Sequence, residues 1–343
     1  MDVPSTPAAA PPLALADQLV QMASGAWLTQ MIHVAAELRL ADLLGEGERS
    51  VEELASACGA HADSLHRLLR GLASVGLFRE TEPMRFGLTP LAELLRGDHP
   101  QSLRQFARML GDEHYLAWHD LLTSVRTGQS AFVSRYGCHV FDFYTKQPER
   151  GEIFDGAMTD FSRRFLEPVL TSYDFSGIHH LVDIGGGLGS LLKAVLRLHP
   201  QMRGTLLERP EVVADVRLEP DLADRLAVVS GDFTKAAPAG ADAYLLKHII
   251  HDWDEPTCVQ ILARIKEVMA PGARVLLLEQ VIPPGNDPSP AKLLDLNMLV
   301  MTDGGRERTP GEYALLMEQA GLQLLRIHPT PSPLSVVEAV AAV

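Results

Sequence analysis

The amino-terminal third of the chain has the hydrophobic pattern of helices. Apolar residues recur at three- and four-residue spacing from Leu13 to about Leu95, as in LVQMASGAWLTQMIHVAAELRLADLL, and this spacing places them on one helix face. Ser50 with Glu53 three residues later predicts the capping-box start of a further helix, which Gly59 ends. After one more helix, LFRETEPMRFGLTPLAELL predicts a short hairpin. Two helices followed by a hairpin predict a winged-helix arrangement.

Beyond Gly177 the pattern changes from helices alone to alternating strands and helices. Residues 101–173 stay helical, and the clearest amphipathic stretch there is GEIFDGAMTDFSRRFLEPVLTSYDF. Apolar runs of strand length then follow, namely HLVDIGG, GTLLER, LAVVSGDF, AYLLKHI, RVLLLEQVI, LQLLRIHP and LSVVEAVAA. Such alternation predicts βαβ units around a buried, mostly parallel sheet. The predicted fold class is therefore α/β, with a doubly wound, Rossmann-like domain after a helical winged-helix domain.

Composition and charge narrow the classes of partner. A length of 343 residues suits one large and one smaller domain, and an apolar fraction of 46% indicates a globular protein. The formal charge of −14 favours small-molecule or protein partners over nucleic acid. Residues 1–100 hold 7 Arg, no Lys and 13 acidic residues, whereas a DNA-reading module normally has a basic face. A packing or dimerisation role is therefore predicted for the winged helix, and a DNA-binding regulator is the disfavoured alternative.

The cysteines and the N-terminal segment favour a reducing, cytoplasmic compartment over a secreted protein. Cys58, Cys138 and Cys258 stand singly and match neither zinc-ligand spacing nor a disulfide framework. The segment MDVPSTPAAAPPLALADQ has no Lys or Arg before its short apolar run and contains four prolines, which predicts a flexible tail and not a signal peptide. No apolar run approaches the roughly 18 residues of a membrane span. A cytoplasmic protein without a membrane partner is predicted.

A glycine-rich turn follows the first predicted strand of the sheet. Gly185, Gly187 and Gly189 in DIGGGLGS have G-x-G-x-G spacing, and glycines let the backbone turn sharply against a ligand. The G-x-G-x-x-G of a nicotinamide site would need glycine at Ser190, so a dinucleotide is disfavoured. Glu208 ends the next strand, where a carboxylate can accept hydrogen bonds from a ribose diol.

The following strand ends in GDF, which is Gly231, Asp232 and Phe233. Asp232 can hold an exocyclic amine while Phe233 packs on the face of an adenine. Together with the glycine turn and Glu208, this motif places suitable groups on three successive strand ends. That set predicts a site for an adenosine-containing cofactor.

The motifs DIGGGLG, LLERP, GDF, LLKHIIHDW and GGRERT occur in an order that resembles one known family. From about Trp27 to the C-terminus the chain is similar to class I S-adenosylmethionine-dependent O-methyltransferases of the caffeic acid, hydroxyindole and bacterial natural-product type. The resemblance implies methyl-donor contacts from Gly185, Glu208, Asp232, Phe233 and Lys247, and Gly231 is also predicted to bind the donor. Many plant members have the shorter Asp in place of Glu208, so a diol contact with a shifted geometry is expected.

The resemblance also implies the domain organisation. Its winged-helix unit interlocks two subunits into a homodimer, and a Rossmann-like methyltransferase domain follows. The predicted segments are a disordered tail (1–12), a winged-helix dimerisation domain (13–100), a helical linker that contributes to the acceptor pocket (101–175) and the methyltransferase domain (176–343).

Titratable residues crowd the end of the predicted strand AYLLKHI. His251 is the predicted general base, because an unperturbed imidazole pKa near 6.5 lets it accept the proton of a phenol or N-hydroxyl at neutral pH. An imidazole must also be oriented, and Glu279 and Glu307 match the two acids that flank the catalytic His in the family. The same alignment implies acceptor contacts from Met158, Phe161, Asp252 and Met298, with the methionines on either side of a flat ring.

These residues define the predicted activity and its alternatives. The prediction is methyl transfer from S-adenosylmethionine, which leaves S-adenosylhomocysteine, to a phenolic or N-hydroxyl group of an aromatic or heteroaromatic natural product, as in antibiotic biosynthesis. N-methylation of a heteroaromatic nitrogen, and hydroxylation or decarboxylation on a methyltransferase-like scaffold, remain alternatives. A metal at His248, His251 and Asp252 is disfavoured, because no further closely spaced ligand is evident in the sequence.

Overall fold

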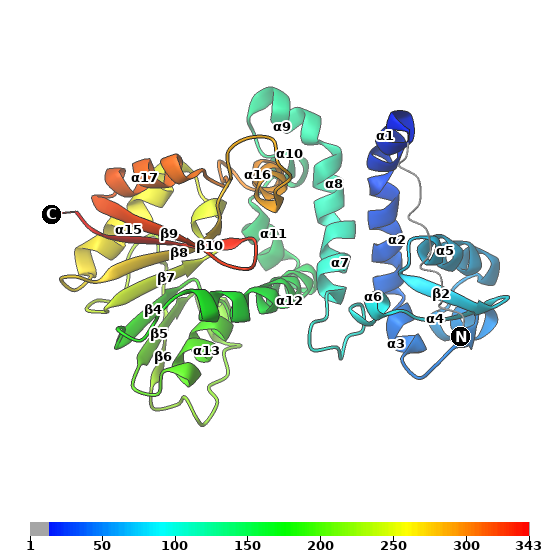
Figure 1. Cartoon of the computed structure of the whole chain (residues 1–343), viewed down its shortest axis with the longest axis horizontal. Helices are drawn as coiled ribbons and strands as arrows, with labels where there is room; N and C mark the ends of the chain where they lie inside the picture. Colours follow the sequence, from blue (N-terminus) through cyan, green and yellow to red (C-terminus); the bar gives the residue numbers. More distant parts are fainter. Residues whose placement is uncertain (1–13, 343) are drawn as a thin grey trace, which may run out of the picture. The chain divides into compact units, whose positions relative to one another are not determined.

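The computed structural model describes residues 14–342, which form two compact units with their boundary in the chain between Glu113 and His114 (Figure 1). The predicted tail, residues 1–12, lies outside the described residues. Within residues 14–342, none of the helices combines the length and the apolar character that crossing a membrane requires.

The N-terminal unit has the predicted helices and hairpin. Its elements are α1 (Leu15–Ala23), α2 (Gly25–Glu37), α3 (Leu40–Leu44), β1 (Arg49–Ser50), α4 (Val51–Cys58), α5 (Ala62–Ser74), β2 (Phe78–Glu82), β3 (Arg85–Leu88), α6 (Pro90–Glu93) and α7 (Arg104–Gly111). The capping box is present, because Glu53 N donates to Ser50 Oγ and Ser50 N donates to the Glu53 carboxylate. Gly59 ends α4 with φ of 69°. The two-residue strand β1, which pairs with β3, was not predicted.

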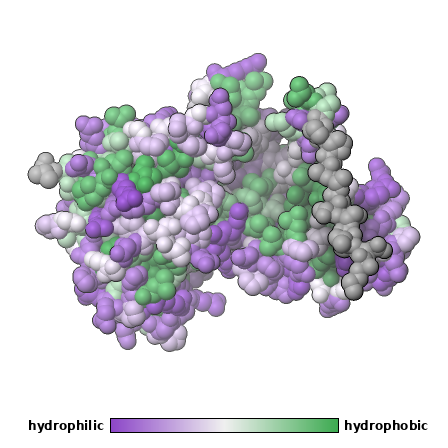
Figure 2. All heavy atoms as spheres, in the orientation of Figure 1, coloured by the Kyte–Doolittle hydropathy of each residue, from purple (hydrophilic) through white to green (hydrophobic). Residues whose placement is uncertain are grey.

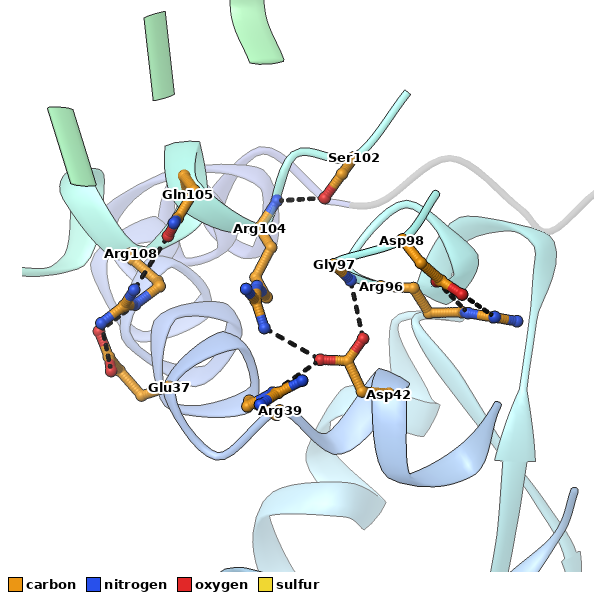
Figure 3. Close-up of polar contacts among 10 residues, drawn as sticks. All are labelled: Glu37, Arg39, Asp42, Arg96, Gly97, Asp98, Ser102, Arg104, Gln105 and Arg108. Carbon is orange, nitrogen blue, oxygen red and sulfur yellow. Dashed lines mark hydrogen bonds and ion pairs between the residues drawn. The ribbon is translucent and has the colours of Figure 1, made fainter. Parts of the chain in front are cut away.

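A polar cluster ties α3 to the segment that enters α7 (Figure 3). Asp42 Oδ1 accepts a hydrogen bond of 2.7 Å from Gly97 N, and Oδ2 accepts bonds of 3.0 Å from Arg39 Nε and Arg104 Nη1. Burial alone would raise the pKa of Asp42, but the amide and the two guanidinium groups outweigh it and hold that pKa below its usual range. The carboxylate therefore stays charged and fixes this segment to the unit.

The second unit is built on a seven-stranded sheet. Its strands are β4 (His180–Ile184), β5 (Arg203–Glu208), β6 (Leu226–Ser230), β7 (Ala243–Lys247), β8 (Arg274–Gln280), β9 (Leu322–Pro329) and β10 (Leu334–Ala341), in the order β6-β5-β4-β7-β8-β10-β9. The first five are parallel, whereas β10 runs antiparallel to both β8 and β9. The sheet is mostly parallel, as predicted, and β9 runs in the same direction as the first five strands, but the inclusion of LSVVEAVAA, which forms β10, among the parallel strands was wrong.

Helices cover both faces of this sheet. The helices of this unit are α8 (Glu113–His119), α9 (Leu121–Thr127), α10 (Ala131–Tyr136), α11 (Val140–Lys146), α12 (Pro148–Ser172), α13 (Ser190–Leu198), α14 (Pro210–Val213), α15 (Glu255–Val268), α16 (Pro290–Met301) and α17 (Pro310–Gln319), with a 3₁₀ turn, η1, at Ile250–Asp252. One apolar layer joins the sheet to α15 and α17, and the other joins it to α12 and α13. Successive residues of β7 alternate between the layers, Tyr244 in the first and Leu245 in the second, because side chains of a strand point alternately to its two faces.

This topology positions the predicted site. The chain leaves β4 toward β5 and β6 on one side, and later returns to β7 and β8 on the other. In open α/β sheets such a reversal of strand order leaves a crevice at the carboxyl ends of the strands, where ligands bind. The glycine turn, Glu208, the GDF motif and Lys247 all lie at these carboxyl ends.

Candidate functional site

The glycine turn after β4 brings the backbone close to its neighbours. Gly185, Gly187 and Gly189 have φ of 65°, 59° and 77°, a region that glycine adopts at no steric cost. A Cβ added to Gly185 would lie 2.6 Å from Ile249 Cδ1 and 3.3 Å from Phe233 Cε1. A side chain at this position would therefore fill the space between the turn and the residues that follow β6 and β7.

Glu208 is anchored to the glycine turn. Its side chain is buried, its Oε2 accepts a hydrogen bond of 3.0 Å from Gly187 N, and its Oε1 accepts one of 2.8 Å from Arg209 N. Carboxylate oxygens have further lone pairs after one such bond. The carboxylate at the end of β5 can therefore accept a diol without releasing the turn.

The GDF motif follows β6 as predicted. Gly231 N donates to Glu208 O over 2.9 Å, which continues the pairing of β5 and β6. The Asp232 side chain is 46% exposed and accepts hydrogen bonds from Thr234 Oγ1 (2.6 Å) and the Thr234 amide (3.0 Å), with Lys235 Nζ at 2.9 Å. The Thr234 hydroxyl first, and then Lys235, hold the pKa of Asp232 below its usual range. Asp232 is therefore an exposed, ionised acceptor beside Phe233.

Lys247 at the end of β7 is half-buried, and Asp183 of the neighbouring strand β4 is buried. Lys247 Nζ donates to Ser162 Oγ of α12 over 2.8 Å. Asp183 is 1% exposed, and its Oδ1 has no hydrogen-bond partner among the described residues. Burial raises the pKa of Asp183 to about 7, opposed by the positive charge of Lys247. An orphaned carboxylate oxygen beneath a glycine cradle fits a ligand with polar and cationic groups, as S-adenosylmethionine has.

His251 sits in a cluster of carboxylates beyond β7. Its Nδ1 is 2.6 Å from Glu307 Oε1 and 3.5 Å from Glu279 Oε2, and its Nε2 is 3.5 Å from Asp252 Oδ1. The His251 side chain is 8% exposed, and those of both glutamates are fully buried. The structure therefore brings together the three predicted catalytic residues. His251 lies in η1, Glu279 in β8 and Glu307 in the loop before α17.

A strained turn holds Glu279 in this cluster. Glu279 Oε1 accepts hydrogen bonds from Ile249 N (3.1 Å) and Ile250 N (2.9 Å). The chain points both amides at one oxygen by turning at His248, which has φ of 54°. A non-glycine residue in the left-handed region costs of the order of 1 kcal/mol or more. The predicted strand AYLLKHI, which runs to Ile249, was therefore too long, because β7 ends at Lys247.

The carboxylates change the protonation of His251. Burial alone would lower the pKa of His251, but Glu279, Asp252 and Glu307 outweigh it and raise that pKa to about 10. Burial in turn raises the pKa of Glu279 to about 7 and that of Asp252 to about 6. The expectation that His251 has an ordinary pKa was wrong, because it ignored acids that only folding brings close. The three carboxylates therefore favour the imidazolium form of His251.

The spacing argument against a metal was incomplete. Glu279, distant in sequence, brings a carboxylate oxygen within 4.8 Å of ring nitrogens of His248 and His251. However, His251 Nδ1 is engaged by Glu307, and Glu279 is fixed by two amides. These contacts suit an oriented imidazole, and we assign no metal to the cluster.

The predicted acceptor residues lie on elements around His251. The Phe161 ring on α12 is 6.1 Å from the ring of His248, which is 5.0 Å from that of His251. Met158 precedes Phe161 on α12 and is half-buried, and Met298 is buried on α16. Asp252 adjoins His251 directly. Phe161 and Asp252 thus contact residues of the cluster directly. For Met158 and Met298 the structure gives only their positions on α12 and α16.

Sequence reasoning missed Arg308 and Ser162, and it placed His248 at this strand end without a catalytic role. Arg308 is fully buried, and Ser162 holds Lys247. Both ring nitrogens of His248 are buried without a hydrogen-bond partner among the described residues, and its pKa lies well below the usual range because of burial. Arg308 had one sequence signal, since it follows Glu307 directly in GGRERT.

The fold and the site define a Rossmann-like methyltransferase with an N-terminal helical domain. Two family models match the chain, the O-methyltransferase domain over residues 118–323 and the O-methyltransferase dimerisation domain over residues 20–98. The chain therefore belongs to the O-methyltransferase family. The predicted fold class, enzyme class and methyl donor are confirmed.

Individual relatives span nearly the whole chain. The phenazine O-methyltransferase PhzM of Lysobacter antibioticus is 43% identical over 328 residues, which cover 95% of this chain and 96% of the relative. The 8-amino-8-demethylriboflavin N,N-dimethyltransferase of Streptomyces davaonensis is 37% identical and covers 90% of each chain. A solved structure of the O-methyltransferase NcsB1 from neocarzinostatin biosynthesis, in complex with S-adenosylmethionine and 2-hydroxy-5-methyl naphthoic acid, has a TM-score of 0.80 and 38% identity, and covers 92% of this chain and 96% of that one.

Proposed function

We propose that the protein transfers a methyl group from S-adenosylmethionine to a phenolic or N-hydroxyl group of an aromatic or heteroaromatic natural product, with His251 as the general base. The observation that carries this proposal is the 2.6 Å contact between His251 Nδ1 and Glu307 Oε1. It leaves Nε2 as the nitrogen that can face an acceptor hydroxyl. A buried carboxylate that holds one imidazole nitrogen fixes the ring and its tautomer.

The protonation of the cluster determines how such a base works. An imidazolium beside a phenolate contains the same number of protons as an imidazole beside a phenol. A bound acceptor can therefore react once the pair has lost one proton in total, and the carboxylates then stabilise the imidazolium that results. The cofactor supplies the electrophilic methyl group, and the chain's own part is to hold the acceptor oxygen and its proton in place.

We expect Asp232→Ala to weaken the binding of S-adenosylhomocysteine about tenfold or more, because it removes a charged hydrogen-bond acceptor from the proposed adenosine site. Calorimetric titration of both proteins measures this change. Asp287→Ala, which removes an exposed carboxylate before α16, is the matched control and should bind as wild type. Equal affinity of the Asp232→Ala variant and wild type would contradict the assignment of the GDF motif.

N-methylation is the second candidate function. It is favoured by the 37% identity to an N,N-dimethyltransferase over 90% of this chain. A nitrogen lone pair attacks without losing a proton first, so such a reaction does not need His251 as a base. A scaffold for hydroxylation or decarboxylation, or a DNA-binding regulator, has no such observation in its favour.

We propose that the protein acts as a cytoplasmic homodimer through its N-terminal unit. Leu15, Leu19, Val20, Met22 and Trp27 of α1 and α2 expose between 66% and 83% of their surface, and Figure 2 shows apolar side chains gathered at α1. Water-exposed apolar faces of this kind mark sites of protein association. The dimerisation-domain match covers residues 20–98, which include Val20, Met22 and Trp27 of this surface, and it supports the proposal.

The double variant Leu19→Glu with Trp27→Glu is therefore expected to be a monomer where the wild type is a dimer, because two buried charges per subunit oppose association. Light scattering after size-exclusion chromatography measures the mass. Leu315→Glu, at a leucine of α17 that is 57% exposed, is the control and should remain dimeric. A wild-type protein that is monomeric at micromolar concentration would exclude this proposal.

A further inference from the structure

The loop between α16 and α17 contains a fully buried arginine next to a proposed catalytic residue. Arg308 directly follows Glu307 and is 0% exposed. Arginine is rarely buried completely unless its charge is paired. The burial of the Arg308 charge therefore requires hydrogen-bond or ion-pair partners inside the protein.

The Arg308 guanidinium bonds to the segment that carries His251. Nη1 donates to Ile250 O over 3.2 Å, and Ile250 is the residue before His251. Nη2 donates to Glu255 Oε2 over 3.0 Å and to Cys258 Sγ over 3.4 Å, at the start of α15. Through this side chain, Arg308, the neighbour of Glu307 in sequence, is bonded to Ile250, the neighbour of His251.

Backbone contacts fix the same loop from the other sides. Glu307 N donates to Asp295 Oδ1 over 3.0 Å, and Ile282 N donates to Arg308 O over 2.9 Å. A Cβ added to Gly305 would lie 2.5 Å from His251 O and 2.9 Å from the carbonyl carbon of Asp252. The loop therefore packs directly on the backbone of η1, at a distance that only glycine allows.

We propose that Arg308 is a positioning residue, whose guanidinium holds the Glu307 loop against η1 and so sets the separation and orientation of the Glu307 carboxylate and the His251 imidazole. The inference rests on the proposed role of His251. The guanidinium of Arg308 contacts the backbone of η1 and the start of α15, and the proposed role does not require it to contact the cofactor or the acceptor. Lysine cannot replace it, because a single ammonium group lacks the planar fork that reaches Ile250 O and Glu255 together.

The charge of Arg308 and its positioning role predict opposite effects on His251. Removal of a nearby positive charge alone would raise the pKa of His251. Release of the Glu307 carboxylate from the imidazole would lower it, because an anion favours the imidazolium. Arg308→Lys keeps the charge and removes the fork, so it isolates the positioning effect.

The test is a titration of the His251 imidazole by NMR in full-length protein labelled with carbon-13 at histidine Cε1. The signal of His251 is assigned by its loss in His251→Gln. Arg308→Lys is expected to lower the titration midpoint of His251 by at least one pH unit, and Arg306→Lys, at an exposed arginine of the same loop, should leave it unchanged. An unchanged midpoint in Arg308→Lys would overturn the proposal.

Two further variants separate positioning from general loss of stability. Gly305→Ala pushes the loop away from η1 without altering any charge, and it should lower the midpoint as Arg308→Lys does, which keeps the proposal testable if the latter does not fold. Glu255→Gln removes a partner of Arg308 but leaves its bond to Ile250 O, so the midpoint should stay close to wild type. An equal shift in Glu255→Gln would overturn the positioning role. The titration does not require turnover, so a failure of His251 as general base would appear separately, as activity retained in His251→Ala.

Discussion

His251→Ala is expected to lower kcat for transfer to a hydroxyl acceptor about 10²–10⁴-fold, the usual contribution of a general base. The His251 side chain is buried against Glu279 and Glu307, so its removal takes away the imidazole that these carboxylates orient. The affinity for S-adenosylhomocysteine should stay close to wild type, because the proposed donor residues lie at the ends of β4, β5, β6 and β7. Transfer measured with S-adenosylmethionine and a hydroxylated phenazine, together with calorimetry, separates the two effects.

His139→Ala is the control for this prediction, because it removes an imidazole that is 58% exposed and should leave both quantities unchanged. An acceptor that reacts through a ring nitrogen provides a second comparison. Its rate should fall by less than about tenfold in His251→Ala, since it has no proton to lose before attack. Loss of donor affinity together with rate would indicate that the cluster supports the fold of the donor site instead of the chemistry.

Local sequence signals predicted the elements of the fold well. The capping box of Ser50 and Glu53 and the left-handed Gly59 act within one helix, so their residues are sufficient to predict it. The antiparallel orientation of β10 was within reach but missed. Only residues 330–333 separate β9 from β10, and a parallel pair needs a crossover of a dozen or more residues. The two-residue strand β1 has no pattern of its own and depends on β3.

The site was predictable in its residues but not in its electrostatics. The strand ends identified Glu208, the GDF motif and His251, because parallel strands bring their carboxyl ends to one edge. The resemblance to the family added Glu279 and Glu307. The pKa of His251, however, depends on distances to acids that lie far away in the chain. The burial of Arg308 could not be predicted either, because a charged residue in a polar loop is expected at the surface.

Glu307→Gln is expected to lower kcat about 10²-fold or more and to change the pH dependence of methyl transfer. Replacement of a buried carboxylate that orients a catalytic imidazole by its amide disturbs the tautomer while it preserves shape. Because Glu279, Asp252 and Glu307 raise the pKa of His251 to about 10, the fraction of neutral imidazole in the free protein grows about tenfold per pH unit below that value. In wild type, kcat/KM should therefore still rise with pH through the neutral range.

The sign of the change in Glu307→Gln follows from the lost charge. With one carboxylate fewer, the imidazolium is less stable, the pKa of His251 falls, and the rising limb of kcat/KM moves to lower pH even though the maximal rate is smaller. This is tested by measuring kcat/KM across pH with two acceptors whose hydroxyl pKa values differ widely. If the rising limb reports the titration of His251, its position on the pH axis will be the same for both acceptors. A wild-type profile that is already level at neutral pH would show that the reacting proton is not controlled by this cluster. Glu307 is the better position for this test, because Glu279 also holds the amides of Ile249 and Ile250 and its loss would disturb the turn itself.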